Sequence, residues 1–203
     1  MQGEIYSLKK GNSDLMKLNQ AITSVLLITA TAGFAIGQDA PKKKGPASPP
    51  AETSVEIGGK KISIKYSAPS VKGRKIFGGS DALQPDNTVW RAGANSATAL
   101  HTEADLTIGK VNVPAGDYTL YVYLDPKAWQ LIVSKQKGQW GINMDGTTTL
   151  KESEVVGRIP MTMSKPPAPI ETYKMTLAST GGNKGKLTLE WENVVASVDF
   201  TAK

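Results

Sequence analysis

The chain has 203 residues and a formal net charge of +6, which suits one folded domain with an N-terminal segment. It contains no cysteine, and this excludes disulfide frameworks, thiolate catalysis and cysteine-ligated metals. Three of the positive charges form the run Lys42-Lys43-Lys44, and the sequence has no basic stripe with interleaved aromatic residues, so we expect no nucleic-acid partner.

The N-terminus has the pattern of an export signal. Residues 18–38 follow Lys17, carry no charge, have an apolar centre and reach small residues at Ala35 and Gly37. These features predict a signal peptide over residues 16–37, cleaved after Gly37, and a periplasmic or secreted protein. The apolar centre is short for a spanning helix, so we expect no stable membrane span after cleavage; an uncleaved anchor is the alternative. Because Met16 begins a better signal than Met1, residues 1–15 are interpreted as a non-native extension.

A segment rich in proline, glycine and lysine comes next, at residues 38–53. Such a composition is typical of an extended, disordered linker. The sequence therefore predicts a single domain over residues 54–203.

Alternating apolar and polar residues dominate this domain. They predict strands at residues 54–57, 62–66, 97–103, 106–108, 111–113, 118–124, 129–133, 173–177, 187–191 and 194–200. Residues 118–124 are apolar on both faces and predict a central strand. Residues 80–89 and 148–156 leave room for at most a turn or two of helix. The pattern predicts an all-β fold, an antiparallel β-sandwich or jelly-roll-like domain of nine or ten strands.

The common catalytic motifs are absent from the sequence, and no catalytic residue can be assigned from them. His101 is the single histidine, so a histidine metal cluster is excluded and a serine triad would have to use His101. We interpret His101 as an ordinary strand residue. We expect neither a metal nor a cofactor.

Two segments are chemically unusual, residues 66–79 and residues 89–98. Arginine binds carboxylate or phosphate in a bidentate way, and tryptophan offers a stacking face for sugars or planar groups. In the structural alternative, Arg91 is buried against an acid such as Asp117 or Glu192, and Trp90 lies in the core. The candidate ligand-binding residues are Tyr66, Lys72, Arg74, Trp90, Arg91 and Asn95.

These segments resemble the signature of the DUF2911 family of exported bacterial domains. The matching stretches are Tyr66-Ser67-x-Pro69-Ser70-x-Lys72-Gly73-Arg74-x-Ile76-Phe77-Gly78, Trp90-Arg91-x-Gly93-Ala94-Asn95-x-Ala97-Thr98, Pro114-Ala115-Gly116-x-Tyr118-x-Leu120, Gln139-Trp140-Gly141 and Leu187-x-Leu189-x-Trp191-Glu192. The resemblance covers about residues 54–200 and implies a secreted β-rich domain with no established activity. Ser96 stands where members of the family often carry an acidic residue.

Three functions are compatible with these observations. The first is a binding module for an anionic small molecule or a glycan, which requires Arg74 and Arg91 to lie on one face. The second is a structural domain that interacts with an envelope protein. The third is a hydrolase or lyase acting on an extracellular polymer, in which the acid or base would be Tyr66, Lys72, Lys75 or His101.

Overall fold

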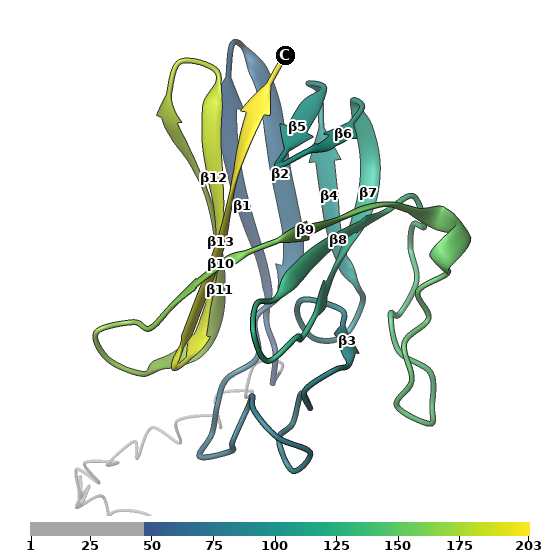
Figure 1. The fold of residues 1–203 in the computed structure, drawn as a ribbon, viewed down its shortest axis with the longest axis vertical. Coiled ribbons are helices and arrows are strands. Elements are labelled where there is room, and N and C mark those ends of the chain that lie inside the picture. The colour runs from purple at the N-terminus through teal and green to yellow at the C-terminus, as the bar shows by residue number, and fades with distance from the viewer. Residues whose placement is uncertain (1–46) are drawn as a thin grey trace, which may run out of the picture. The chain divides into compact units, whose positions relative to one another are not determined.

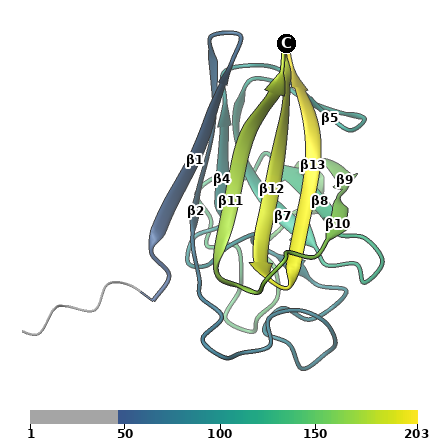
Figure 2. The same cartoon turned by 90° about the vertical axis from the view of Figure 1, so that its left-hand side faces the viewer.

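A computed structural model describes residues 47–203, which form two antiparallel β-sheets packed face to face (Figure 1). The seven-stranded sheet has the order β1-β2-β4-β7-β8-β9, with β3 paired to β7, and the six-stranded sheet has the order β11-β12-β13-β5-β6, with β10 paired to β13. The turned view shows β11, β12 and β13 as one layer in front of β4 and β7 (Figure 2). The domain is therefore the all-β sandwich that the sequence predicts.

The strands of the seven-stranded sheet are β1 (Pro50–Ile57), β2 (Lys60–Ser67), β3 (Val89–Trp90), β4 (Thr98–Thr102), β7 (Gly116–Tyr123), β8 (Gln130–Ser134) and β9 (Val155–Pro160). Those of the six-stranded sheet are β5 (Leu106–Ile108), β6 (Val111–Val113), β10 (Thr162–Ser164), β11 (Ile170–Gly181), β12 (Lys184–Glu192) and β13 (Val194–Ala202). The one helical element of residues 47–203 is a 3₁₀ turn, η1 (Glu152–Glu154), and no described helix is long and apolar enough to cross a membrane.

The core lies between the sheets and follows from the two-residue period of the strands. In β12, every second residue is buried, including Leu187, Leu189 and Trp191. These side chains belong to one apolar cluster with residues of the opposite sheet such as Ile62 and Ile64. One end of this core consists of aromatic rings in mutual contact, namely Phe77, Trp90, Trp129, Tyr173 and Trp191.

The edge strand β11 is sealed by side chains of the facing sheet. The backbone N–H of Met175 donates to the hydroxyl of Tyr66 over 3.0 Å, and that of Leu177 donates to Oγ1 of Thr53 over 3.0 Å. Unpaired strand edges favour association with other chains, and covering them is one of the ways in which proteins prevent it. Strands β1 and β2 thus satisfy the outer edge of β11 without joining its sheet.

The strand β7 is central and is buried on both faces, as the sequence predicts. Its inward residues enter the core, whereas Tyr121 points outward and is still fully buried. Residues 135–149 fold over this outer face, where the amide of Gln139 donates to the Tyr121 hydroxyl over 2.9 Å. This covering segment also creates a wall beside the exposed part of the sheet.

The structure corrects the predicted boundary between linker and domain. β1 begins at Pro50, so residues 50–53, predicted to belong to the linker, pair with β2 from Pro50 opposite Ser67 onward. Proline is tolerated here because β1 is an edge strand and needs no N–H on its free side. The predicted extension (1–15), signal peptide (16–37) and most of the predicted linker lie outside the described residues.

The predicted number of strands is too low, because β3, β9 and β10 were not expected. β3 and β10 have two and three residues, too few for an alternating pattern. β9 contains Gly157 and Pro160, which normally argue against a strand. Gly157 is needed because a Cβ atom there would lie 2.6 Å from side-chain atoms of Val111.

Candidate functional site

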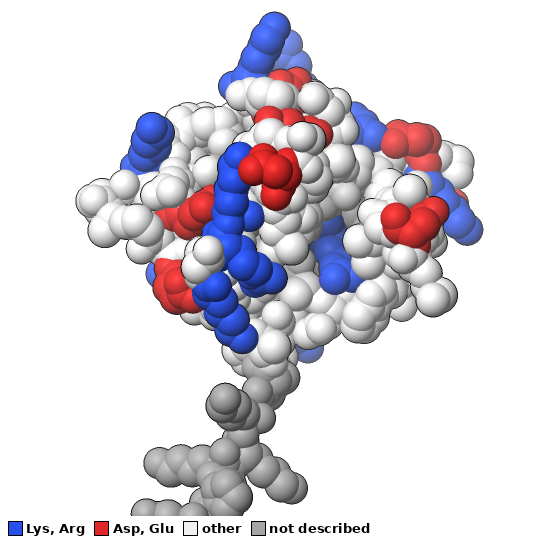
Figure 3. All heavy atoms as spheres, turned by 90° about the horizontal axis from the view of Figure 1, so that it is seen from below, with Lys and Arg blue, Asp and Glu red and all other residues white. Residues whose placement is uncertain are grey.

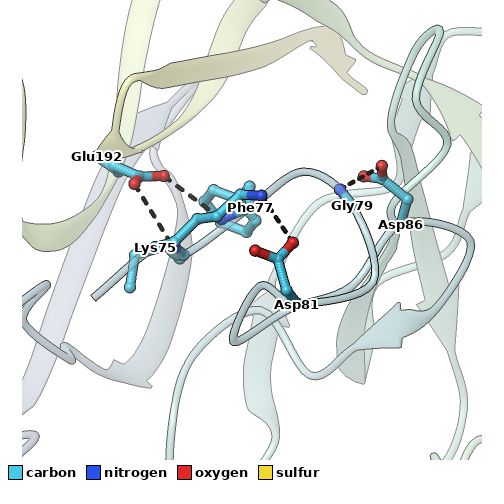
Figure 4. A network of polar contacts seen from close by, with 7 residues as sticks. Lys75, Phe77, Gly79, Asp81, Asp86 and Glu192 are labelled. Atoms are coloured by element: carbon cyan, nitrogen blue, oxygen red, sulfur yellow. Dashed lines mark hydrogen bonds and ion pairs between the residues drawn. The ribbon is translucent and has the colours of Figure 1, made fainter.

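The first unusual segment continues from β2 into a loop, residues 68–79, that is fixed to the domain by polar contacts (Figure 4). The carboxylate of Glu192, at the end of β12, accepts hydrogen bonds from the backbone N–H groups of Ile76 and Phe77 at 3.3 and 3.4 Å. The Phe77 ring then packs against Trp129, with ring centroids 4.6 Å apart. The loop is thus attached both to the six-stranded sheet and to the aromatic core.

Two further contacts close this loop. Lys75 pairs with Asp81 at 2.7 Å, and the backbone N–H of Gly79 donates to Asp86 over 2.7 Å. The hydrogen bond from Lys75 lowers the pKa of Asp81. Because Lys75 is engaged in this pair, it is a poor candidate for the acid or base of an enzyme.

Of the cationic candidates in the first segment, Arg74 binds within its own loop, whereas the side chain of Lys72 is exposed. The guanidinium of Arg74 folds back onto its own backbone and donates to the carbonyls of Ser70 and Val71 over 2.6 and 3.0 Å. The backbone N–H of Lys72 donates to Oε1 of Glu171 over 2.9 Å. Arg74 is therefore a loop-closing residue in this structure.

Tyr66 and Trp90 are core residues. Trp90 is 3% exposed, stacks on Trp191 with ring centroids 5.8 Å apart, and donates its indole N–H to the carbonyl of Gly93 over 3.0 Å. Tyr66 is 9% exposed and packs edge-on against Tyr173. The prediction that Trp90 offers a stacking face to a ligand is wrong, because its rings are covered by other rings. Tyr66 is likewise unavailable, because its hydroxyl seals β11.

The second segment joins the first at Asn95, whose amide donates to Oγ of Ser67 and to the carbonyl of Ser48, both at 3.2 Å. Arg91 lies elsewhere, with Nη1 donating to the carbonyl of Trp140 over 3.2 Å. Within residues 47–203, Arg91 has no carboxylate partner. The structural alternative, in which Arg91 is buried against an acid such as Asp117 or Glu192, is therefore not what the described domain shows.

The six candidates consequently do not form one pocket. Arg74 and Arg91 share no contact: Arg74 bonds to its own loop, and Arg91 bonds to residue 140. Viewed from the loop end, Lys and Arg side chains alternate with Asp and Glu side chains, and much of the surface is uncharged (Figure 3). The binding site predicted from the two segments is not assembled at this end of the domain.

A groove lies instead on the outward face of the seven-stranded sheet, and we call it the sheet groove. It is open to solvent and has a volume of about 750 Å³. Its floor comes from the outward residues of β1, β2, β4 and β7, and its wall comes from residues 137–139 of the covering segment. The lining polar side chains are those of Glu52, Lys61, Ser63, Lys65, Ser96, His101, Glu103, Asp117, Thr119, Lys137 and Gln139.

The lysines of the sheet groove are available, whereas two of its acids are engaged. Lys61, Lys65 and Lys137 form no ion pair with any carboxylate of the described domain. Glu103 accepts a hydrogen bond from the backbone N–H of Lys61 over 2.7 Å, and Asp117 pairs with His101. These bonds do not cancel the charges of the two carboxylates, and Glu52 also lines the groove, so three lysines stand with three carboxylates and the lining carries no net positive charge. What the groove offers an anion is its three ammonium groups without an ion-pair partner in the described domain.

The family comparison agrees with this description of the domain. A family model described as a protein of unknown function, DUF2911, matches residues 48–200, nearly all of the described residues. The chain belongs to the DUF2911 family. Comparisons with curated proteins and with solved structures found no match.

In this DUF2911 domain, His101 occupies the centre of the groove floor. It lies opposite Ser63 of β2 and opposite Asp117 of β7, so that serine, histidine and aspartate stand in one row across three strands. Nδ1 of His101 is 2.7 Å from Oδ1 of Asp117. No hydrogen bond joins Ser63 to His101, although both belong to the described residues.

This row is poorly suited to acyl transfer. A serine nucleophile needs the imidazole within hydrogen-bond reach, and the reaction needs free N–H groups for the developing oxyanion. Strands β2 and β4 are each paired on both sides, so their N–H groups are used in the sheet. The row therefore lacks two requirements of acyl transfer.

The sequence contained only part of the signal for this site. Lys61, Ser63 and Lys65 alternate with the core residues of β2, as do Ala99 and His101 with those of β4. An alternating polar face is typical of a solvated sheet surface. Only the covering segment turns this face into a groove, and nothing in residues 135–149 predicts where that segment folds.

Proposed function

We propose that this DUF2911 domain is a binding module that holds a small anionic molecule in the sheet groove. One observation carries the proposal: Lys61, Lys65 and Lys137 surround an open groove without an ion-pair partner in the described domain. An ammonium group without an ion-pair partner can form charge-assisted hydrogen bonds with a bound carboxylate or phosphate. Ser63 and His101 add hydrogen-bonding groups that would orient the ligand.

The His101–Asp117 pair would orient the imidazole toward a bound ligand. A carboxylate only accepts hydrogen bonds, so Asp117 favours the proton on Nδ1 of His101. The second ring nitrogen is then left for a ligand. It accepts a hydrogen bond when the ring is neutral and donates one when the ring is protonated.

Calorimetric titration of the purified protein with citrate, phosphate and galacturonate, with glucose as a neutral control, tests the proposal. We expect at least one anion to bind and glucose not to bind. Lys65→Gln should weaken that anion about tenfold, since a hydrogen bond to a charged group is worth about 1.5 kcal/mol. Lys110→Gln, in the exposed turn between β5 and β6, is the matched control. The proposal fails if none of the anions binds, or if Lys65→Gln binds them as the wild type does.

We further propose that the protein is exported, on the strength of the charge-free, apolar residues 18–38 behind Lys17. Mass spectrometry of the protein from cell fractions tests this. We expect a mature N-terminus at Gln38 in the periplasm or the medium. An intact N-terminus in the cytoplasmic fraction would contradict it.

A further inference from the structure

Trp140 is the one exposed tryptophan of the chain. It is 55% exposed, whereas Trp90, Trp129 and Trp191 are each at most 7% exposed. Exposing an indole forgoes the burial of a large apolar surface, and such rings are commonly found where a partner covers them. The question is whether its surroundings favour a particular partner.

The backbone around Trp140 is held tightly in place. The N–H of Ala97 donates to the carbonyl of Gln139 over 3.1 Å, and Arg91 donates to the carbonyl of Trp140. Gly141 has a φ of +91°, and a Cβ atom there would lie 2.8 Å from Cβ of Arg91 and 2.9 Å from Cβ of Ala97. The backbone that carries the indole is therefore anchored on both sides of Trp140 to the second segment, residues 89–98.

Arg91 lies over the indole, with Cζ 5.3 Å from the ring centroid. Burial lowers the pKa of Arg91, but a guanidinium stays charged in proteins. Only one hydrogen bond from its side chain is made within the described domain, although a guanidinium has five donors. The guanidinium covers one face of a ring that is still 55% exposed, and we call this pair the Trp140 platform.

The Trp140 platform continues from the sheet groove. Gln139, which precedes Trp140 in the chain, lines the groove, and so does Ala97, whose N–H donates to the carbonyl of Gln139. The indole thus follows directly on the groove wall without being part of its lining. A ligand that reaches both the groove lysines and the indole must therefore be longer than a single small anion. It must combine anionic groups with a face that packs on an aromatic ring.

Building on the proposed function, we propose that the ligand is an acidic oligosaccharide. One of its pyranose rings stacks on Trp140, and the carboxylates of neighbouring units bind Lys61, Lys65 and Lys137. The C–H face of a pyranose is the apolar surface that an indole can cover, while its hydroxyls and carboxylate match a polar groove. Arg91 supplies further donors to a carboxylate next to the stacked ring.

The experiment compares galacturonic acid, trigalacturonate and hexagalacturonate, with cellohexaose as a neutral chain of equal length. Affinities are measured by calorimetry, and tryptophan fluorescence is measured with the quencher acrylamide. We expect hexagalacturonate to bind at least tenfold more tightly than the monomer and to protect the fluorescence from quenching. Because the other three tryptophans are buried, that protection reports on Trp140.

Variants separate the two parts of the site. Trp140→Ala should weaken hexagalacturonate about tenfold and leave the monomer within twofold, and Trp140→Phe should keep much of the affinity for the hexamer. Lys65→Gln should weaken both. Protection from acrylamide in the wild type is an independent readout if Trp140→Ala alters the loop.

Three results would overturn the inference. In the first, hexagalacturonate binds no more tightly than the monomer and leaves quenching unchanged. This result would refute a role of the Trp140 platform and would leave anion binding in the sheet groove intact. In the second, cellohexaose binds as well as hexagalacturonate, which removes the role of the carboxylates. In the third, citrate or phosphate binds but no galacturonate does. The sheet groove would then bind small anions, and the assignment of an acidic oligosaccharide would be wrong.

Discussion

Nδ1 of His101 on β4 lies 2.7 Å from Oδ1 of Asp117 on β7, in the floor of the sheet groove. Both side chains are half exposed, at 50% and 58%. Water screens such a pair, so its contribution to the free energy of unfolding is small. The geometry instead fixes which ring nitrogen faces the groove.

Asp117→Asn should therefore change the tautomer of His101 more than the stability of the domain. In the wild type, neutral His101 should carry its proton on Nδ1, whereas an asparagine can accept or donate and should relax this preference. Because the chain has one histidine, its imidazole ¹⁵N signals are assigned without ambiguity. The free energy of unfolding, measured in urea, should change by about 1 kcal/mol or less. A wild-type ring protonated mainly on Nε2 would contradict this.

Trp90→Ala should destabilise or unfold the domain. Removing a buried tryptophan typically costs about 3 to 5 kcal/mol, against a stability of about 5 to 15 kcal/mol for an ordinary domain. Trp140→Ala is the control, since its ring is exposed, and should cost less than about 1 kcal/mol. Chemical unfolding monitored by circular dichroism measures both. Equal losses in the two variants would mean that the core is not built around Trp90.

Glu192 should be required for the attachment of the first loop. Ile76 is fully buried, so Glu192→Ala leaves its N–H without a partner and should cost about 2 kcal/mol. Glu192 also has a φ of +52°, which glycine adopts without strain, so Glu192→Gly should be less destabilising than Glu192→Ala by about 1 kcal/mol. Glu190→Ala, next to the exposed Lys174, should change little. An alanine variant more stable than the glycine variant would refute the role of the backbone.

Tyr173 should make the domain sensitive to alkali. Burial raises the pKa of Tyr173 well above its usual value near 10, and its hydroxyl has no hydrogen-bond partner among the described residues. The unfolded chain loses this proton as the pH rises past 10 while the folded domain keeps it, so stability is fully present below pH 10 and falls above it. Tyr173→Phe should lessen this fall and, at neutral pH, raise the stability by about 1 kcal/mol. The free energy of unfolding of both proteins is measured between pH 8 and 11. If it falls equally with pH in the wild type and in Tyr173→Phe, the prediction is wrong.

The strands that could be predicted are those whose burial is one-sided or complete. β12 alternates clearly, and β7 is buried on both faces from Tyr118 to Val122, so sequence pattern and burial agree. The sequence predicts β1 shorter than it is, because the proline at residue 50 is typical of a linker. An edge strand nevertheless accepts proline. The family resemblance was confirmed, since it depends on motifs rather than on register.

The candidate site was harder to predict, because tertiary neighbours determine what each motif does. The Trp90-Arg91 pair shows this: Trp90 points into the core, whereas its neighbour Arg91 reaches the carbonyl of Trp140, 49 positions away. The sequence identified both as unusual but could not separate packing from binding. His101 was interpreted as an ordinary strand residue, because its pairing with Asp117 depends on the register of β4 with β7.

The sealed edge of β11 has a consequence for how the domain folds. Its two sealing contacts join residues 109 and 124 positions apart. Contacts between such distant residues require large loops to close first, and domains rich in them fold slowly. Before β11 has been synthesised, Thr53 and Tyr66 of a nascent chain have no such partners. We therefore expect refolding on the scale of milliseconds to seconds, with β11 among the last elements to gain protection from hydrogen exchange.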